Sequence, residues 1–194
     1  MTESFKKAYA ITMKHEGGYV NDPDDRGGET YSGISRRWHP GWEGWRIIDG
    51  CKADPEFPSC LAKIKSLQEQ VELFYFRNFW AKNNCEQMPE IIAKEVFDNA
   101  INMGPDDSGK FLQHALNALN RNQKIYSDLK VDSWIGTKTL KALDVLVERN
   151  EVELLYKVIN ILQGAHYIEQ MNKFPEQEKY VGWFKRVEFI KHPG

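Results

Sequence analysis

The chain has 194 residues, and 26 Lys and Arg against 28 Asp and Glu give it a formal net charge of −2. This balance excludes the strongly basic surface typical of nucleic-acid-binding proteins, and no apolar run is long enough for a membrane span. Hydrophobic residues make up 41% of the chain and aromatic residues 12%, which is typical of a folded protein and not of a disordered one. We therefore expect a compact monomer with neither a nucleic-acid partner nor a membrane span.

Helical periodicity dominates the first half of the chain, with one interruption. Apolar residues at three- and four-residue steps predict a first helix that ends at Gly17–Gly18, since glycine suits the left-handed position after a helix. The stretch 17–58 is interrupted by Gly and Pro and predicts a short β-hairpin with long loops. Helical spacing returns after Ser59, a candidate N-cap, and continues to Tyr75.

The second half predicts further helices. Pro89 is expected at the first position of a helix that ends at Gly104–Pro105. The others are expected at about 107–119, from Thr137 as a cap through Val147, from Asn150 in a capping box to about Met171, and from Pro175 onwards. The pattern thus predicts a mostly α protein with one small β segment.

An acidic segment is the most informative part of the sequence, because residues 16–30 hold five carboxylates and one Arg. Glu16 is expected at the C-terminus of a helix, where the helix dipole and nearby carboxylates raise the pKa of its carboxyl group. A carboxyl that is protonated near neutral pH can give its proton to a leaving oxygen, and Gly and Pro turns can fold Asp25 back toward it. Two carboxylates in different environments can divide acid and base roles, as glycoside hydrolysis requires.

The same segment has simpler interpretations. A Glu before Gly-Gly is often a solvated helix end, and Asp-Pro-Asp-Asp is common in turns. A calcium loop counted from Asp22 fails, because its twelfth position is Gly33 where an acidic residue is needed. A zinc-protease motif at His15–Glu16 fails as well, because Tyr19 stands where the second His is needed. The sequence therefore predicts no metal site.

Several blocks of the chain carry a family resemblance. Residues 16–23 read Glu-Gly-Gly-Tyr-Val-Asn-Asp-Pro, and residues 25–35 read Asp-Arg-Gly-Gly-Glu-Thr-Tyr-Ser-Gly-Ile-Ser. Further blocks lie at 96–105, 112–116, 132–140 and 182–187. Together the blocks resemble glycoside hydrolase family 108, which comprises lysozyme-like N-acetylmuramidases, some of them described as secretion activators. The last blocks resemble the peptidoglycan-binding region that accompanies these enzymes.

The resemblance implies a mostly α, lysozyme-like fold of two lobes, with a small β-hairpin beside the active-site cleft. It implies a catalytic region over residues 1–95 and a helical peptidoglycan-binding region over residues 96–194, packed into one compact unit. Glu16 would be the general acid. The order of Glu16, Asp25 and Thr30 is similar to that in phage T4-type lysozymes, so Asp25 would be the base and Thr30 a hydrogen-bond partner for the attacking water. No metal or organic cofactor is implied, since two carboxylates and a water suffice.

Four further residues are candidates for substrate binding. Tyr19 and Tyr31 flank the acidic loop and either stack on sugar rings or brace the hairpin. Asn102, in an Asn-Met-Gly-Pro run, either offers an amide to an N-acetyl group or ends a helix. Trp134 lies at a turn–helix junction and is a further candidate.

Two other groups of side chains leave alternatives open. Trp38, Trp42 and Trp45 cluster in a Gly- and Pro-containing loop and form either a substrate wall or hydrophobic filling. Cys51 and Cys60 are close enough in sequence to form a disulfide, which geometry decides. Whether the reaction inverts or retains the anomeric configuration depends on the carboxylate separation, which also stays open.

The expected function is a bacteriolytic peptidoglycan hydrolase that cleaves the β-1,4 bond between N-acetylmuramic acid and N-acetylglucosamine. Its partner would be the peptidoglycan glycan strand. The alternative is a non-catalytic peptidoglycan-binding or secretion-assisting protein on a lysozyme scaffold. The N-terminal residues lack the order of a secretory signal, so we expect synthesis in the cytoplasm and action at the cell wall or periplasm through a dedicated export or lysis route.

Overall fold

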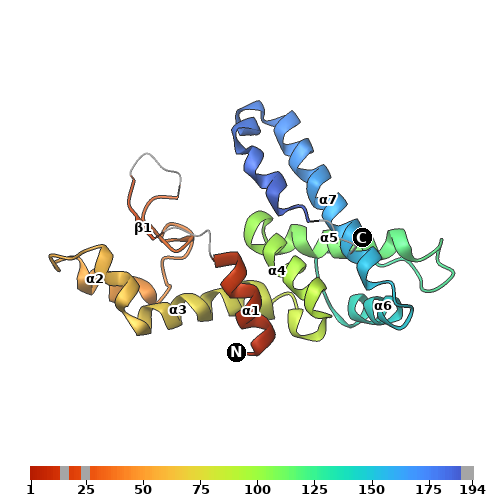
Figure 1. Cartoon of the computed structure of the whole chain (residues 1–194), viewed down its shortest axis with the longest axis horizontal. Helices are drawn as coiled ribbons and strands as arrows, with labels where there is room; N and C mark the ends of the chain where they lie inside the picture. The colour runs from red at the N-terminus through yellow and green to blue at the C-terminus, as the bar shows by residue number, and fades with distance from the viewer. Residues whose placement is uncertain (14–17, 23–26, 189–194) are drawn as a thin grey trace, which may run out of the picture. The chain divides into compact units, whose positions relative to one another are not determined.

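The structure is a computed structural model that describes residues 1–13, 18–22 and 27–188 (Figure 1). The chain divides into two compact units, Met1–Asn78 and Phe79–Gly194, called here the N-terminal unit and the C-terminal unit. Both units are mainly helical, as predicted. The division at residue 95 between a catalytic region and a peptidoglycan-binding region is a functional one, and it stays a prediction.

The N-terminal unit combines helices with a small sheet. Its elements are α1 (Glu3–Thr12), β1 (Tyr19–Val20), β2 (Thr30–Tyr31), β3 (Ile34–Ser35), α2 (Gly44–Cys51), η2 (Ser59–Lys63) and α3 (Lys65–Tyr75). Helix α1 begins after Thr2, whose hydroxyl accepts a hydrogen bond from the Phe5 N–H at 3.4 Å. Phe5, Ala8 and Thr12 are buried on one side of α1, which confirms the predicted face. The predicted end at Gly17–Gly18 is wrong, because α1 ends at Thr12 with Met13 as its C-cap.

The predicted hairpin is present and carries a third strand. The strands are antiparallel in the order β1-β2-β3, with Tyr31 opposite both Tyr19 and Ile34. Ser32 and Gly33 join β2 to β3 with φ values of 46° and 76°, the left-handed conformations that a tight two-residue hairpin turn requires. Because side chains alternate along a strand, Tyr31 and Ile34 enter the core while Thr30 lies on the opposite face.

The single helix predicted from Ser59 to Tyr75 is wrong in its first turns. Ile64 has an extended backbone (φ −85°, ψ 100°) and separates the 3-10 helix η2 from α3. Ser59 is not an N-cap, because its hydroxyl donates to the carbonyl of Glu56 at 2.6 Å. The buried face of α3 is confirmed, and α3 continues into a π-helical turn, η3 (Phe76–Ala81).

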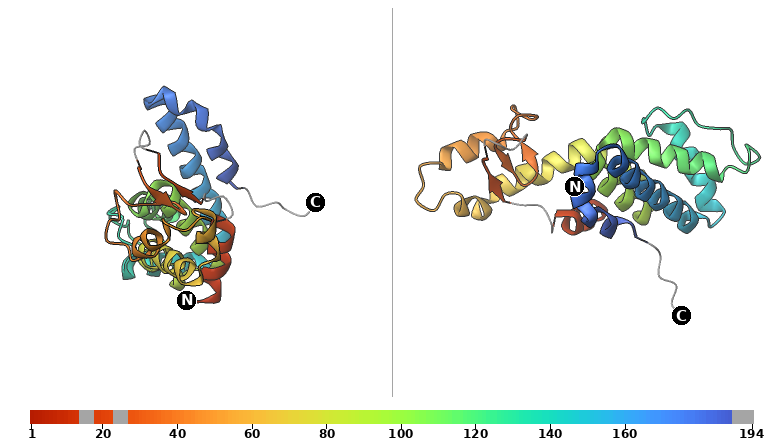
Figure 2. Two further views of the ribbon diagram at one scale, coloured as in Figure 1. Left: turned by 90° about the vertical axis from the view of Figure 1, so that its left-hand side faces the viewer. Right: turned by 90° about the horizontal axis from the view of Figure 1, so that it is seen from above.

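The C-terminal unit is built on three long helices that pack against one another, α4, α5 and α7. Its elements after η3 are η4 (Cys85–Gln87), α4 (Glu90–Met103), α5 (Pro105–Leu119), α6 (Thr137–Glu148), α7 (Val152–Lys173) and η5 (Pro175–Arg186). Segment η5 returns alongside α7 (Figures 1 and 2). The fully buried Phe97, Leu112, Leu116 and Leu155 lie at the centre of this packing.

The helix boundaries differ from the prediction at three caps. Pro89 precedes α4 as its N-cap and is not its first residue, and Gly136, not Thr137, precedes α6. Asn150 has a φ of 58° and follows the end of α6, as left-handed Asn often does, whereas Glu151 precedes α7. The capping box predicted at Asn150 is therefore wrong.

Candidate functional site

The sheet of the N-terminal unit holds the described residues on both sides of the acidic segment. The Ser32 N–H donates to the carbonyl of Gly18 at 3.3 Å. The Thr30 hydroxyl donates to the carbonyl of Gly28 at 3.1 Å, and the Ser35 hydroxyl donates to that of Gly27 at 2.6 Å. Two side chains on the polar face of the sheet therefore fix the backbone that directly follows residues 23–26.

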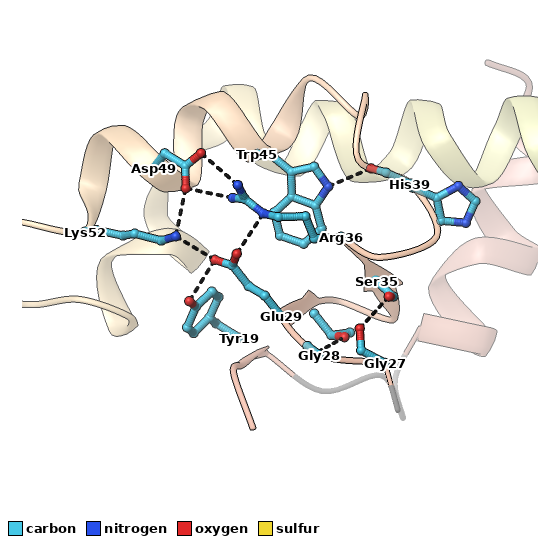
Figure 3. A network of polar contacts seen from close by, with 11 residues as sticks. Tyr19, Gly27, Gly28, Glu29, Ser35, Arg36, His39, Trp45, Asp49 and Lys52 are labelled. Carbon is cyan, nitrogen blue, oxygen red and sulfur yellow. Dashed lines mark hydrogen bonds and ion pairs between the residues drawn. The ribbon is translucent and has the colours of Figure 1, made fainter. Parts of the chain in front are cut away.

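A network of two acids, two bases and a tyrosine extends from this sheet to α2 (Figure 3). Glu29 accepts the Tyr19 hydroxyl at 2.8 Å and lies 2.7 Å from Arg36 Nε and 2.9 Å from Lys52 Nζ. Arg36 also binds Asp49 with two hydrogen bonds, at 2.7 and 3.0 Å. The four charges cancel, so the network joins β1, β2, β3 and α2 without adding net charge.

The network also shifts the pKa values of its members. Hydrogen bonds from Arg36 and then Lys52 lower the pKa of Asp49 to about 2. Burial, followed by the hydrogen bond to Glu29, raises the pKa of Tyr19. Asp49 therefore stays ionised and Tyr19 stays protonated throughout the neutral range, which keeps the network intact.

Arg36 also contacts an aromatic side chain, in addition to its two acidic partners. Its guanidinium lies 4.6 Å from the centre of the Trp45 ring, and the Trp45 Nε1–H donates to the carbonyl of His39 at 2.8 Å. Trp45 is 3% exposed and therefore fills the unit, and Trp42, which is half-buried, meets it edge to face at 5.1 Å. Trp38 is 69% exposed, and Trp38 and Trp42 both line a hollow of about 450 Å³ in the same unit, so the wall interpretation stays open for these two residues.

The structure describes only part of the predicted catalytic set. Glu16 and Asp25 lie outside the described residues. Thr30 lies at the centre of the sheet, half-buried, and its hydroxyl keeps its lone pairs after donating to Gly28.

The two tyrosine candidates have different environments. Tyr19 is half-buried, with its ring edge to face on Phe57 at 4.8 Å. Tyr31 is 4% exposed, and its hydroxyl accepts a hydrogen bond from Gln68 Nε2 at 2.8 Å. Because a ring buried to that extent presents little surface to a sugar, its environment favours the second of the two roles left open for Tyr31, bracing of the hairpin.

The other two candidates belong to the C-terminal unit. Asn102 is exposed, and its Nδ2 donates both to the carbonyl and to the carboxylate of Asp98, at 2.7 and 3.0 Å. Those bonds stabilise the last turn of α4 and use both amide protons, which favours the helix-end role. Trp134 is 66% exposed in the loop between α5 and α6.

The sequence missed the partners of Glu29. Arg36, Asp49 and Lys52 are separated by 13 and 3 residues along the chain, and no local pattern marks them as a set. Only the structure reveals that the Glu29 side chain is 13% exposed and therefore requires cations beside it.

Three further features concern the cysteines, possible metal ligands and helices of the described residues. Cys51, Cys60 and Cys85, all within that part of the chain, are free thiols. No group of three or more His, Cys, Asp or Glu side chains in the described ranges is arranged to hold a metal ion. None of the described helices has both the length and the apolar character needed to cross a membrane.

Comparison with known proteins defines the class. The family model for glycosyl hydrolase 108 matches residues 9–104, and the model described as a predicted peptidoglycan domain matches residues 108–188. Residues 9–104 belong to the glycosyl hydrolase 108 family, as the sequence blocks indicated. A glycosidase family related to peptidoglycan is thereby established for the chain.

Among solved structures, the chain is similar to SagA of Brucella abortus. The two are 24% identical, with a TM-score of 0.52 over 95% of this chain and 89% of that one. This likeness shows a shared fold, so the mostly helical, lysozyme-like fold class is confirmed. No protein with a curated description matches the chain significantly.

Proposed function

We propose that this protein is an N-acetylmuramidase that cleaves the β-1,4 bond between N-acetylmuramic acid and N-acetylglucosamine in peptidoglycan. Glu16 donates the proton to the leaving oxygen, Asp25 activates a water, and Thr30 accepts a hydrogen bond from that water. The cell wall would be the site of action. Peptidoglycan as the partner is supported by the domain match over residues 108–188.

The observation that carries the proposal is the coincidence of the family match with the fixed polar contacts of the sheet. Glu16 precedes β1 by three residues, and Asp25 lies in the connection from β1 to β2. Both connections start or end at backbone that the sheet holds, at Gly18 and at Gly27. Fixed supports of this kind favour catalysis, since the groups of an active site must keep their geometry.

The supporting network suits a site that must work on an anionic polymer. Arg36 and Lys52 together balance the charges of Glu29 and Asp49, so Glu29 adds no unpaired negative charge beside the acidic segment. Of the four other carboxylates in residues 16–30, the proposal assigns the chemistry to Glu16 and Asp25. Two carboxylates and a water account for the whole reaction.

Substitution Glu16→Gln tests this assignment, because it preserves shape while removing the titratable proton. We expect release of reducing ends from purified peptidoglycan to fall by about 10²–10⁴-fold. The control Glu69→Gln makes the same substitution at a side chain of α3 that is 60% exposed, and should keep the wild-type rate. If the wild type binds insoluble peptidoglycan but releases no reducing ends, the result would support the non-catalytic alternative instead.

A further inference from the structure

The C-terminal unit contains a cavity of about 780 Å³ that the proposed chemistry does not use. Its lining comes from the 126–132 segment and from α6, and it includes Trp134, Lys138 and Lys141. All of its lining residues belong to this one unit. A hollow of this size accommodates a sugar ring with a substituent.

The loop that carries Trp134 is fixed by one buried side chain. Gln113 is 1% exposed, and its Oε1 accepts the N–H groups of Asp132 and Ser133 at 2.9 and 3.0 Å. Its Nε2 donates to the Asp132 carboxylate at 3.0 Å and to the Trp134 carbonyl at 3.1 Å. One amide thus satisfies three consecutive residues of the loop, which leaves the Trp134 backbone little freedom.

The same loop contains a strained conformation. Ser133 has a φ of 70°, which is unfavourable for a residue other than glycine. Its carbonyl oxygen lies so near Gly109 of α5 that a Cβ there would be 2.1 Å away. Strain of this kind persists only where the surroundings impose it, and it is concentrated at functional positions.

The Trp134 indole is held in place while remaining open to solvent. A Cβ added to Gly136 would lie 2.7 Å from Trp134 Nε1, so the ring lies against the glycine backbone. Even so, Trp134 is 66% exposed. A single exposed indole needs no explanation. This indole, however, lies against Gly136 at a cavity, on a loop that a buried amide fixes, and is therefore suited to stack on a ligand ring.

The charges around the cavity favour an anion. The carboxylate of Asp128 accepts the Asn120 side chain, and that of Asp132 accepts Gln113 and the Trp134 N–H. Both acids hold the loop and keep their charge, and against them Lys130, Lys138 and Lys141 give the lining a formal net charge of 3 − 2 = +1. Lys138 and Lys141 are exposed, and neither takes part in an ion pair within the described ranges. Lys138 also lies in the first turn of the 12-residue helix α6, where the helix dipole adds positive potential.

We propose that this cavity is a second saccharide-binding site that takes a muramyl peptide of peptidoglycan, with the sugar ring on Trp134 and a carboxylate of the peptide at Lys138 and Lys141. The choice of ligand class rests on the proposed function, whereas the position of the site rests on the cavity and its fixed indole. Stacking explains binding of the sugar, and the two lysines explain a preference for an acidic substituent. The site thus distinguishes peptidoglycan from a neutral polymer of N-acetylglucosamine.

Calorimetric titration of the full-length protein tests the site with two ligands that contain no glycosidic bond to cleave. These are N-acetylmuramyl-L-alanyl-D-isoglutamine, which carries a carboxylate, and N-acetylglucosamine, which is neutral. We expect the wild type to bind the muramyl peptide more tightly. Trp134→Ala should weaken that binding about tenfold, as truncation of an aromatic anchor commonly does, whereas Trp134→Phe should retain most of it.

The lysines are tested by a second variant that keeps the indole. The double substitution Lys138→Gln and Lys141→Gln should remove the preference for the muramyl peptide and leave binding of N-acetylglucosamine unchanged. The matched control Lys65→Gln with Lys124→Gln removes the same charge from outside the cavity lining and should change neither affinity. Because both lysines of the site are exposed, the variant tests the proposal even if Trp134→Ala unfolds.

Three results would overturn the proposal: no binding of the muramyl peptide by the wild type, equal affinity in folded Trp134→Ala, or an unchanged preference in the double lysine variant. Each is distinct from a failure of the catalytic assignment, which is measured as reducing ends released by Glu16→Gln. The Glu16→Gln variant should bind the muramyl peptide at Trp134 as the wild type does.

Discussion

Thr30 is the proposed catalytic residue whose surroundings the structure describes. Its hydroxyl donates to the Gly28 carbonyl at 3.1 Å, which fixes the oxygen and leaves its lone pairs for a water. We expect Thr30→Ala to lower kcat about tenfold with little change in KM, because a misplaced water slows the reaction and not substrate binding. Initial rates of reducing-end release measure this. Thr30→Ser keeps the hydroxyl and should remain near the wild-type rate, and equal rates for all three proteins would exclude the role.

Single residues were predictable where a local pattern determines their environment. The alternation of side chains along a strand explains why Tyr31 is buried and Thr30 is not. The family motif indicates Glu16 and Asp25 as the residues to substitute. The partners of Glu29 were beyond prediction, because Arg36 and Lys52 approach it only once β3 and α2 have folded against the sheet. Long-range contacts of this kind leave no periodic signal in a single sequence.

At the scale of elements, the approach of α5 to the Trp134 loop depends on one glycine. A Cβ at Gly109 would lie 2.1 Å from the Ser133 carbonyl oxygen, so Gly109→Ala must displace either the helix or the loop. We expect a loss of about 1–3 kcal/mol in the free energy of unfolding. Gly50→Ala in α2 is the matched control, since a Cβ there meets nothing within 4 Å and should stabilise the helix by about 0.5–1 kcal/mol. Urea denaturation of both variants measures the difference, and equal effects would show that the close approach is unimportant.

A buried carboxyl in α4 makes the C-terminal unit sensitive to pH. Glu95 is 5% exposed, and burial, followed by the charge of Asp98, raises its pKa to about 8. Asn99 donates to its Oε1 at 3.2 Å, and the Asn99 Oδ1 accepts Gln163 of α7 at 2.6 Å. The group is therefore protonated in the folded protein at neutral pH, although it would be ionised in the unfolded chain.

The sign of the resulting pH dependence follows from linkage. Because the folded state binds a proton that the unfolded state has lost, the stability contributed by protonated Glu95 is complete below about pH 4.5 and is lost as pH rises to about 8. We expect Glu95→Gln to flatten this decline and to raise stability above pH 8 by about 2–5 kcal/mol. Thermal unfolding of variant and wild type at pH 5 and pH 9 measures it. A parallel decline in both proteins would show that other groups are responsible.

Helical faces were predicted better than helix ends. Burial along a helix follows its periodicity, which a sequence displays directly, and α3 and α4 bury the residues that the spacing indicated. Caps depend on the local competition between backbone conformations. Ser59 bonds backward to Glu56, and Asn150 takes a left-handed conformation, so neither begins a helix although both residue types commonly do.

At the scale of the whole molecule, the net charge of −2 conceals unlike local environments. Glu29 and Asp49 are matched by Arg36 and Lys52 in the N-terminal unit, and the cavity of the C-terminal unit presents Lys138 and Lys141. In the proposal, attraction to an anionic wall polymer would have a local origin and would not require a basic protein. The two family matches, over residues 9–104 and 108–188, fit a chain in which hydrolysis and wall binding are separable.

The most direct test of muramidase activity is the release of reducing ends from purified peptidoglycan by the wild type and by Glu16→Gln, with the products identified by mass. The wild type should yield muropeptides that end in N-acetylmuramic acid. The variant, with an unchanged melting temperature, should release them at least about 10²-fold more slowly. A folded Glu16→Gln protein that works at the wild-type rate would contradict the catalytic assignment.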